Sequence, residues 1–274
     1  MNYLAGDQPP LESVTVVVTR AQAQSEPLFS ALSRAGAHVV ALPVIAIADP
    51  CDDGDAMRRV VALAMQHHYD WVVFSSVNAV QRFVGMLGGG RDLGYTRIAA
   101  VGDATSAALC AHGLATDLVP QSASAEALAA AMPSAAHSAA TSATAAAGTG
   151  RVLFPCAAEA REVLASRLRA KGWAVDDVEA YRTVAAGPND GATEEALETA
   201  SNADVVTFTS PSTVRFYVEL AAGRRMPPVV ACIGPVTSRA ASLAGLRVDA
   251  VAQVQSADGL VRALVEHRAG RRAP

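Results

Sequence analysis

The sequence lacks the residue spacings that mark most metal and nucleotide sites. Its four cysteines contain no CxxC pair, and its six histidines show neither HxxxH nor HExxH spacing. We therefore expect no metal site and no disulfide framework. No GxxxxGK[ST] loop or GxGxxG fingerprint occurs either, which argues against nucleotide binding.

Long apolar runs and excess positive charge are also missing. No stretch approaches the roughly 18 consecutive apolar residues of a membrane span. The first ten residues lack the basic and apolar regions of a signal peptide. The net charge of −4 argues against a protein that binds nucleic acid by neutralising phosphates. Hydrophobic residues make up 51% of the chain, but 59 residues are alanine, so the bulky apolar content is ordinary. We expect a cytoplasmic globular protein.

The chain does contain a strand–helix pattern that occurs twice. A β-branched run at 14–19 precedes an amphipathic helix ending at Gly36 and a second strand at 38–43. The same order recurs from Arg151, with a helix stop at Gly172. At a constant offset of 136, the matching residues are Leu28, Leu32, Gly36 and Val39 with Leu164, Leu168, Gly172 and Val175.

The later parts of the two copies match more closely. Residues 69–80 resemble residues 203–214, and residues 98–105 resemble residues 230–237. Strands that alternate with helices of this length indicate an α/β fold with doubly wound parallel sheets. The duplication predicts two similar lobes of this kind. Ligands of such folds bind outside the carboxyl ends of the strands.

Small hydroxyl residues and glycines follow four of these strands, where a helix begins. A helix N-terminus with nearby hydroxyls binds anions through backbone N–H groups, without needing a charged side chain. Four such ends would suit a ligand with several anionic groups, although each Ser or Thr could equally be a simple N-cap. The candidate binding residues are Ser75, Ser76, Gly102, Thr209, Ser210, Ser212 and Gly234.

Two further residues stand at strand ends. Tyr181 has Ile45 as its counterpart at the 136 offset, so the strand itself does not require a hydroxyl there. The alternative is a half-buried tyrosine at a junction between lobes. Arg20 could bind a ligand carboxylate or pair with Glu26. Four other arginines are weaker candidates, each also typical of a solvated helix charge: Arg161, Arg182, Arg215 and Arg239. No histidine lies at a strand end, so nucleophilic catalysis by a Ser/His/Asp set is not indicated.

Taken together, these motifs resemble the uroporphyrinogen-III synthase family over about residues 14–264. The segments that carry the resemblance are 18–20, 41–44, 74–76, 101–105, 179–183, 208–212 and 233–237. Two departures are visible. Phe-Ser-Ser stands at 74–76, and an Ala/Ser/Thr-rich segment at 133–150 lies outside the pattern. We expect that segment to be a flexible insertion rather than a weak alanine helix.

The resemblance implies two α/β lobes joined by a two-stranded connection. The first lobe would be discontinuous, formed by residues 12–44 and 184–274, and the second would span 45–183. The crossing strands would be residues 42–47 and 178–183. A monomer is implied as well.

The resemblance also implies an enzyme, a lyase that closes hydroxymethylbilane into uroporphyrinogen III in haem, sirohaem or cobalamin biosynthesis. This linear tetrapyrrole has eight carboxylates; closure loses water and inverts ring D through a spiro intermediate, with no metal or organic cofactor. Tyr181 would be the proton donor, and Thr237 and Thr105 would be positioning donors. Ser76 and Ser210 would hold substrate carboxylates. A hand-over of the substrate from hydroxymethylbilane synthase is a further expectation.

Two other functions remain open at this point. The first is a non-catalytic two-lobed cytoplasmic binder of a poly-carboxylate ligand. The second is a duplicated nucleotide-binding enzyme, which the missing glycine-rich fingerprint weakens. The porphyrin isomer formed from hydroxymethylbilane discriminates between these functions and the synthase.

Overall fold

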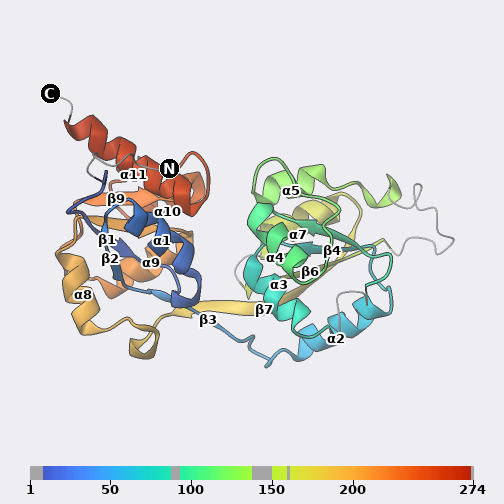
Figure 1. Ribbon diagram of the computed structural model, residues 1–274. Coiled ribbons are helices and arrows are strands. Elements are labelled where there is room, and N and C mark those ends of the chain that lie inside the picture. The colour runs from blue at the N-terminus through green and yellow to red at the C-terminus, as the bar shows by residue number, and fades with distance from the viewer. Residues whose placement is uncertain (1–8, 88–92, 138–149, 159–160, 273–274) are drawn as a thin grey trace. The chain divides into compact units, whose positions relative to one another are not determined.

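The computed structural model describes residues 9–87, 93–137, 150–158 and 161–272, and the chain divides into two compact units (Figure 1). Unit 1 consists of Met1–Ile47 and Thr183–Pro274, and unit 2 consists of Ala48–Arg182. The family resemblance implied boundaries after residues 44 and 183. No helix in the described residues is both long and apolar enough to cross a membrane.

Unit 1 is built on a five-stranded sheet in the order β10-β9-β8-β1-β2, with all neighbouring strands parallel. Its strands are β1 (Thr15–Val18), β2 (His38–Ala41), β8 (Val205–Phe208), β9 (Val229–Cys232) and β10 (Ala250–Val251). Val16 and Val18 pack on one face, toward α1 (Glu26–Arg34) and α11 (Ala257–Arg272). Val17 packs on the other face. That face carries α8 (Glu194–Ser201), α9 (Pro211–Leu220) and α10 (Pro235–Leu243).

A second five-stranded sheet, in the order β3-β7-β6-β4-β5, belongs mainly to unit 2, although residues 45–47 of β3 and 183–185 of β7 are part of unit 1. Its strands are β3 (Ile45–Ala48), β4 (Trp71–Phe74), β5 (Arg97–Ala100), β6 (Arg151–Ala157) and β7 (Ala174–Ala185). The β7–β6, β6–β4 and β4–β5 pairs are parallel. The helices of unit 2 that lie wholly within the described residues are α2 (Asp55–Met65), α3 (Val77–Val84), α4 (Asp103–Ala111), α5 (Ala125–Ala131) and α7 (Arg161–Ala170). The α/β class with parallel sheets is therefore confirmed.

Each sheet takes strands from both sequence copies. The first copy contributes β1 and β2 to unit 1 but β4 and β5 to unit 2. The second copy contributes β6 and β7 to unit 2 but β8 and β9 to unit 1. The order β9-β8-β1-β2 in one sheet corresponds to β5-β4-β6-β7 in the other. The two copies have thus exchanged halves while keeping the same spatial order.

The local packing of the two units repeats as well. Phe74 and Phe83 meet edge to face with ring centroids 5.3 Å apart, and Phe208 and Tyr217 do the same at 5.3 Å. The helices α1 and α7 are each followed by a glycine in the left-handed region, Gly36 at φ +87° and Gly172 at φ +86°. Glycine adopts this conformation without the steric cost that a Cβ imposes, so it ends both helices as expected.

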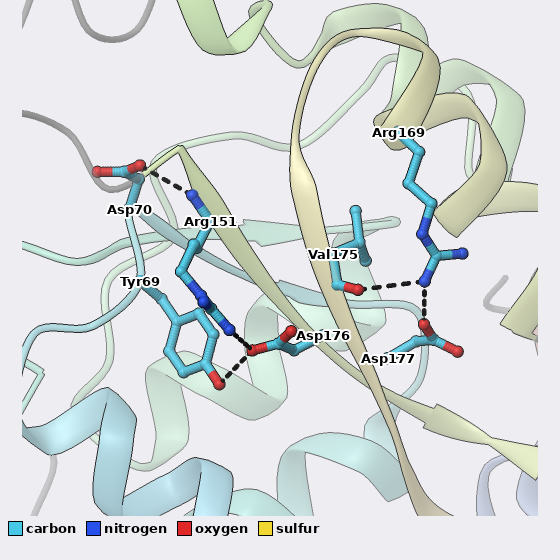
Figure 2. A network of polar contacts seen from close by, with 7 residues as sticks. All are labelled: Tyr69, Asp70, Arg151, Arg169, Val175, Asp176 and Asp177. Atoms are coloured by element: carbon cyan, nitrogen blue, oxygen red, sulfur yellow. Dashed lines mark hydrogen bonds and ion pairs between the residues drawn. The ribbon is translucent and has the colours of Figure 1, made fainter.

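Carboxylates tie the amino ends of the strands together. In unit 2, Asp70 Oδ2 accepts from the backbone N–H of Gly150 at 2.7 Å and of Arg151 at 3.2 Å. Arg151 in turn pairs with Asp176 at 2.6 Å, and the Tyr69 hydroxyl donates to the same carboxylate at 2.9 Å (Figure 2). Burial and the nearby Asp176 raise the pKa of Tyr69 above its ordinary value, so Tyr69 stays a neutral donor. This network fixes the edge of the sheet opposite to the candidate site.

Candidate functional site

Two of the candidate helices begin with a serine in the same conformation. Ser76 has φ −159° and ψ 153° before α3, and Ser210 has φ −161° and ψ 161° before α9. Each serine oxygen accepts from the backbone N–H three residues later, Ala79 or Thr213, at 3.2 Å. Both serines therefore act as N-caps, which was the simpler of the two interpretations from the sequence. Each nevertheless remains partly exposed at the carboxyl end of its strand.

The other two candidate helices begin with a glycine and have no side-chain cap. Gly102 precedes α4 and Gly234 precedes α10, both with extended backbone. The first-turn N–H groups of these helices are thus not covered by a capping side chain, and the positive end of each helix dipole lies at the glycine. Thr105 and Thr237 occupy the first turns of α4 and α10, each with 4% of its surface exposed. A ligand anion could bind such a terminus through backbone amides.

In both sheets the loop that carries the capping serine lies beside the point where the strand order reverses. In unit 1 the chain leaves β1 toward β2 on one side, and β8 lies on the other side. In unit 2 the same relation holds for β6, with β7 on one side and β4 on the other. Thr209 and Ser210 follow β8, and Ser75 and Ser76 follow β4. Such a switch point is where open α/β sheets bind their ligands.

Tyr181 lies on β7 and reaches Ser76. Its hydroxyl donates to Ser76 Oγ at 3.0 Å, although the two residues are 105 positions apart. Only 7% of the Tyr181 surface is exposed. The β6–β7 register shifts by one residue at this point, since Cys156 pairs with Glu179 and Ala157 pairs with Tyr181. A shift of this kind re-aims a strand side chain, and here it brings the phenol to the site.

Arg20 follows β1 in unit 1 and contacts a different partner from the one considered from the sequence. Its Nε and one terminal nitrogen both donate to Gln24 Oε1 at 3.3 Å. Glu26 instead accepts from the Ser30 hydroxyl at 2.8 Å. Burial lowers the pKa of the Arg20 guanidinium from its usual value, because the charged form loses solvation. A half-buried guanidinium held by a neutral amide keeps its positive charge available for an anion.

The weaker arginine candidates have different surroundings in the structure. Arg182 donates to the Asp49 carbonyl at 3.0 Å and lies 3.6 Å from Glu179. Arg215 lies over the Phe216 ring, 4.4 Å from its centroid. Arg239 is exposed on α10, and the side chain of Arg161 lies outside the described residues. Arg182, Arg215 and Arg239 therefore have structural surroundings that do not single them out as ligand-binding groups.

The candidate residues are distributed over both units. Unit 2 carries Ser75, Ser76, Gly102, Thr105 and Tyr181. Unit 1 carries Arg20, Thr209, Ser210, Ser212, Gly234 and Thr237. Within the described residues, no group of three or more His, Cys, Asp or Glu side chains could hold a metal ion. Most of the expected insertion, residues 138–149, lies outside the described residues.

The sequence did not reveal two contacts of the site. The hydrogen bond between Tyr181 and Ser76 depends on which strands are neighbours, and no local spacing signals it. The partner of Arg20 could have been found, because Gln24 follows four residues later across a short 3-10 turn at Gln22–Gln24.

Comparison with known proteins gives a consistent result. A family model described as "Uroporphyrinogen-III synthase HemD" matches residues 26–262. The uroporphyrinogen-III synthase of Synechococcus elongatus is 32% identical over 270 residues, which cover 93% of this chain and 96% of the relative. A mutant uroporphyrinogen III synthase from the extremely thermophilic bacterium Thermus thermophilus has a similar fold, with a TM-score of 0.60, 18% identity and coverage of 94% of this chain and 100% of that one. The uroporphyrinogen-III synthetase from Helicobacter pylori gives a TM-score of 0.59 at 13% identity, covering 92% of this chain and 99% of that one.

Proposed function

The chain belongs to the uroporphyrinogen-III synthase family, and from this we propose that it closes hydroxymethylbilane into uroporphyrinogen III. Water is lost and ring D is inverted in this reaction. The enzyme is accordingly a cyclising lyase of tetrapyrrole biosynthesis. The family model and the relative from Synechococcus elongatus support the activity, and the site geometry supports the kind of substrate.

One observation carries the assignment of the substrate to the site. Four helix N-termini with serine or glycine caps follow strands at the carboxyl edges of the two sheets, two in each unit. They offer backbone N–H groups, hydroxyls and the positive ends of helix dipoles. A substrate with eight carboxylates needs several such places, and the net charge of −4 does not favour bulk electrostatic attraction of an anion in their place. We assign carboxylate binding to Arg20, Ser75, Ser76, Gly102, Thr209, Ser210, Ser212 and Gly234.

The chemistry requires one proton donor and tight control of geometry. Loss of the terminal hydroxyl gives an electrophilic azafulvene, which the substituted carbon of ring D attacks to form a spiro intermediate. Fragmentation and re-closure then invert the ring. The bilane also closes unaided to the wrong isomer, so the enzyme mainly determines which carbon attacks. We assign the proton supply to Tyr181, with Thr105 and Thr237 as positioning donors.

Three further properties belong to the same proposal. The protein acts as a monomer, works in the cytoplasm and receives hydroxymethylbilane from hydroxymethylbilane synthase. Light scattering at working concentration tests the first property. Comparing the type III fraction with premixed and with separately added hydroxymethylbilane synthase tests the hand-over, because direct transfer leaves less time for unaided closure.

Isomer analysis tests the proposed activity. The protein is incubated with hydroxymethylbilane, and the porphyrins are oxidised and separated. We expect type III uroporphyrin to form faster than the unaided type I product. If only type I forms at the unaided rate, the proposed activity is wrong. Binding of the bilane without turnover would then support the alternative of a non-catalytic poly-carboxylate binder.

A further inference from the structure

The contacts of Ser76 determine where its own proton can point. Its oxygen accepts from the Ala79 N–H at 3.2 Å and from the Tyr181 hydroxyl at 3.0 Å. A serine oxygen has two acceptor positions and one proton to donate. Both acceptor positions are filled, so the Ser76 proton is directed away from these two donors. The Tyr181 proton, in contrast, is already engaged with Ser76.

Ser76 is also more exposed to solvent than Tyr181. Tyr181 is 7% exposed, whereas Ser76 is partly exposed at the end of β4. Ser76 also precedes the first turn of α3, where the helix dipole stabilises negative charge on an oxygen. A substrate at the carboxyl edge of this sheet therefore meets Ser76 before Tyr181.

The second sequence copy shows that the arrangement is not simply part of the cap. Ser210 accepts from Thr213 N–H at 3.2 Å, like its counterpart, but its second neighbour is Ser212 Oγ at 2.8 Å. The counterpart of Tyr181 is Ile45, which has no hydroxyl. Helix capping alone requires no tyrosine, so the phenol in unit 2 serves another purpose.

Resting on the proposed function, but giving Ser76 a different role from carboxylate binding, we propose that Ser76 is the catalytic residue that delivers the proton to the leaving hydroxyl, and that Tyr181 is a positioning residue that resupplies it. The C–O bond of the terminal hydroxymethyl group breaks, and the oxygen leaves with the bonding electron pair. That oxygen takes the Ser76 proton and departs as water, while Ser76 takes the Tyr181 proton. The electron pair of the pyrrole nitrogen forms the azafulvene cation.

The proton count closes within the reaction itself. The substrate loses one proton when the re-closed macrocycle regains its aromatic pyrroles. That proton returns through Ser76 to the phenolate of Tyr181, so both hydroxyls end as they began. Neither an oxidant nor another reactant is required.

A double-mutant cycle tests this relay. Ser76→Ala, Tyr181→Phe and the double variant are assayed for kcat and KM of type III formation. We expect each single change to lower kcat by about a hundredfold, the usual contribution of general acid catalysis. The double variant should lose no more than the worse single one, because both changes interrupt the same path. KM should change little, since a pure binding role would raise KM instead.

Three further variants separate the relay from a structural effect. Ser76→Thr keeps the hydroxyl and the cap and should retain most of kcat. Ser76→Asn keeps a capping oxygen but replaces the hydroxyl by an amide, so it should lose kcat even if Ser76→Ala fails to fold. Ser124→Ala removes the cap of α5, where Ser124 accepts from Ala127 N–H at 3.1 Å, and should leave kcat unchanged.

The outcomes distinguish the relay from the proposed function. If the unmodified protein forms no type III product, the proposed function itself is wrong. A second outcome would overturn the relay alone. The unmodified protein would form type III product, Ser76→Ala and Ser76→Asn would retain full kcat, and Tyr181→Phe would lose kcat. Tyr181 would then donate the proton directly to the substrate. Losses that multiply in the double variant would also overturn it, because they would mean two independent contributions.

Discussion

At the scale of the residue, the two copies differ where chemistry is expected. Arg20 follows the first strand of its copy, and at the offset of 136 its counterpart is Cys156, a buried residue. Tyr181 has Ile45 as its counterpart. The serine and glycine caps, in contrast, are repeated with the same backbone conformation. The repeated caps suit binding of similar groups, and the single guanidinium and single phenol make the two units chemically different.

Replacing Arg20 by Gln should weaken substrate binding. The half-buried guanidinium is held by Gln24 rather than by a carboxylate, so its charge is free to attract an anion. We expect KM for hydroxymethylbilane to rise about tenfold with little change in kcat, as for loss of uniform binding. Steady-state kinetics of type III formation measure both constants. Arg34→Gln, which removes an exposed arginine 3.5 Å from Asp258, is the matched control and should leave KM unchanged. An unchanged KM for Arg20→Gln would exclude Arg20 from binding.

Tyr217 should make the protein less stable at alkaline pH. Burial raises its pKa from 10.0 to about 12, because the charged phenolate would lose solvation. Between these two values the unfolded chain releases the proton and the folded chain keeps it, so the free energy of unfolding falls as pH rises. The loss reaches on the order of 2 kcal/mol by pH 12.

The variant Tyr217→Phe should remove that contribution. Phenylalanine already occupies the equivalent position in the other unit, Phe83, so the ring packing is retained. Urea unfolding at pH 9 and pH 11.5 should show a smaller loss of stability for the variant than for the unmodified protein. Cys232, whose pKa burial raises to about 11, contributes equally to both proteins. Identical pH dependence of the two proteins would contradict the assignment to Tyr217.

At the scale of the element, glycine is required at positions 102 and 234 because a larger side chain would collide with a neighbouring residue. The backbone conformation at Gly102 and Gly234 does not itself require glycine. Both have extended backbone that any residue can adopt. A Cβ on Gly102 would lie 2.8 Å from Ala123 Cβ, and one on Gly234 would lie 2.9 Å from Gln255 Cγ. The loop before the next helix therefore packs directly on each glycine. The side chain that would be displaced is short and fixed in unit 2 but long and flexible in unit 1.

This difference predicts unequal costs of the same substitution. Gly102→Ala should destabilise the protein by about 1–3 kcal/mol, the usual cost of overpacking. Gly234→Ala should cost less than about 1 kcal/mol, because Gln255 can turn away. Urea unfolding measures both, and the double variant Gly102→Ala with Ala123→Gly should recover most of the loss. Equal costs for the two single variants would show that the contact with Ala123 is not the cause.

At the scale of the whole molecule, the sequence predicted the repeat, the strands and the helix starts, but not how the strands are ordered. Local signals such as the glycine at the end of α1 and the serine before α3 report on neighbouring residues only. The order of strands in a sheet and the register shift at Cys156 depend on packing between distant segments. The contact of Tyr181 with Ser76 follows from both, so composition and spacing could not predict it. The division of the chain into two units came from a resemblance rather than from such local signals.

Unit 2 should fold without unit 1. It is one continuous segment with its own sheet, and its hydrophobic core includes Trp71, Phe154 and Leu164. A fragment spanning residues 45–185 retains β3 beside β7 and the Tyr181–Ser76 hydrogen bond. We expect far-UV circular dichroism of an α/β protein and one cooperative transition in urea. A fragment spanning 45–172 is the control, because it lacks β7, which separates β3 from β6, and should lose the transition.

The same fragment tests whether catalysis needs both sequence copies. Residues 45–185 carry Ser76, Gly102, Thr105 and Tyr181 but lack Arg20 and the helix starts of unit 1. With five of the eight proposed carboxylate-binding residues missing, hydroxymethylbilane cannot be held in the geometry that directs attack by the substituted carbon. We therefore expect the folded fragment to give only the unaided type I product, while the full chain gives type III under the same conditions. Type III formation by the fragment at the rate of the full chain would show that unit 2 suffices, and would exclude the groups of unit 1 from the reaction.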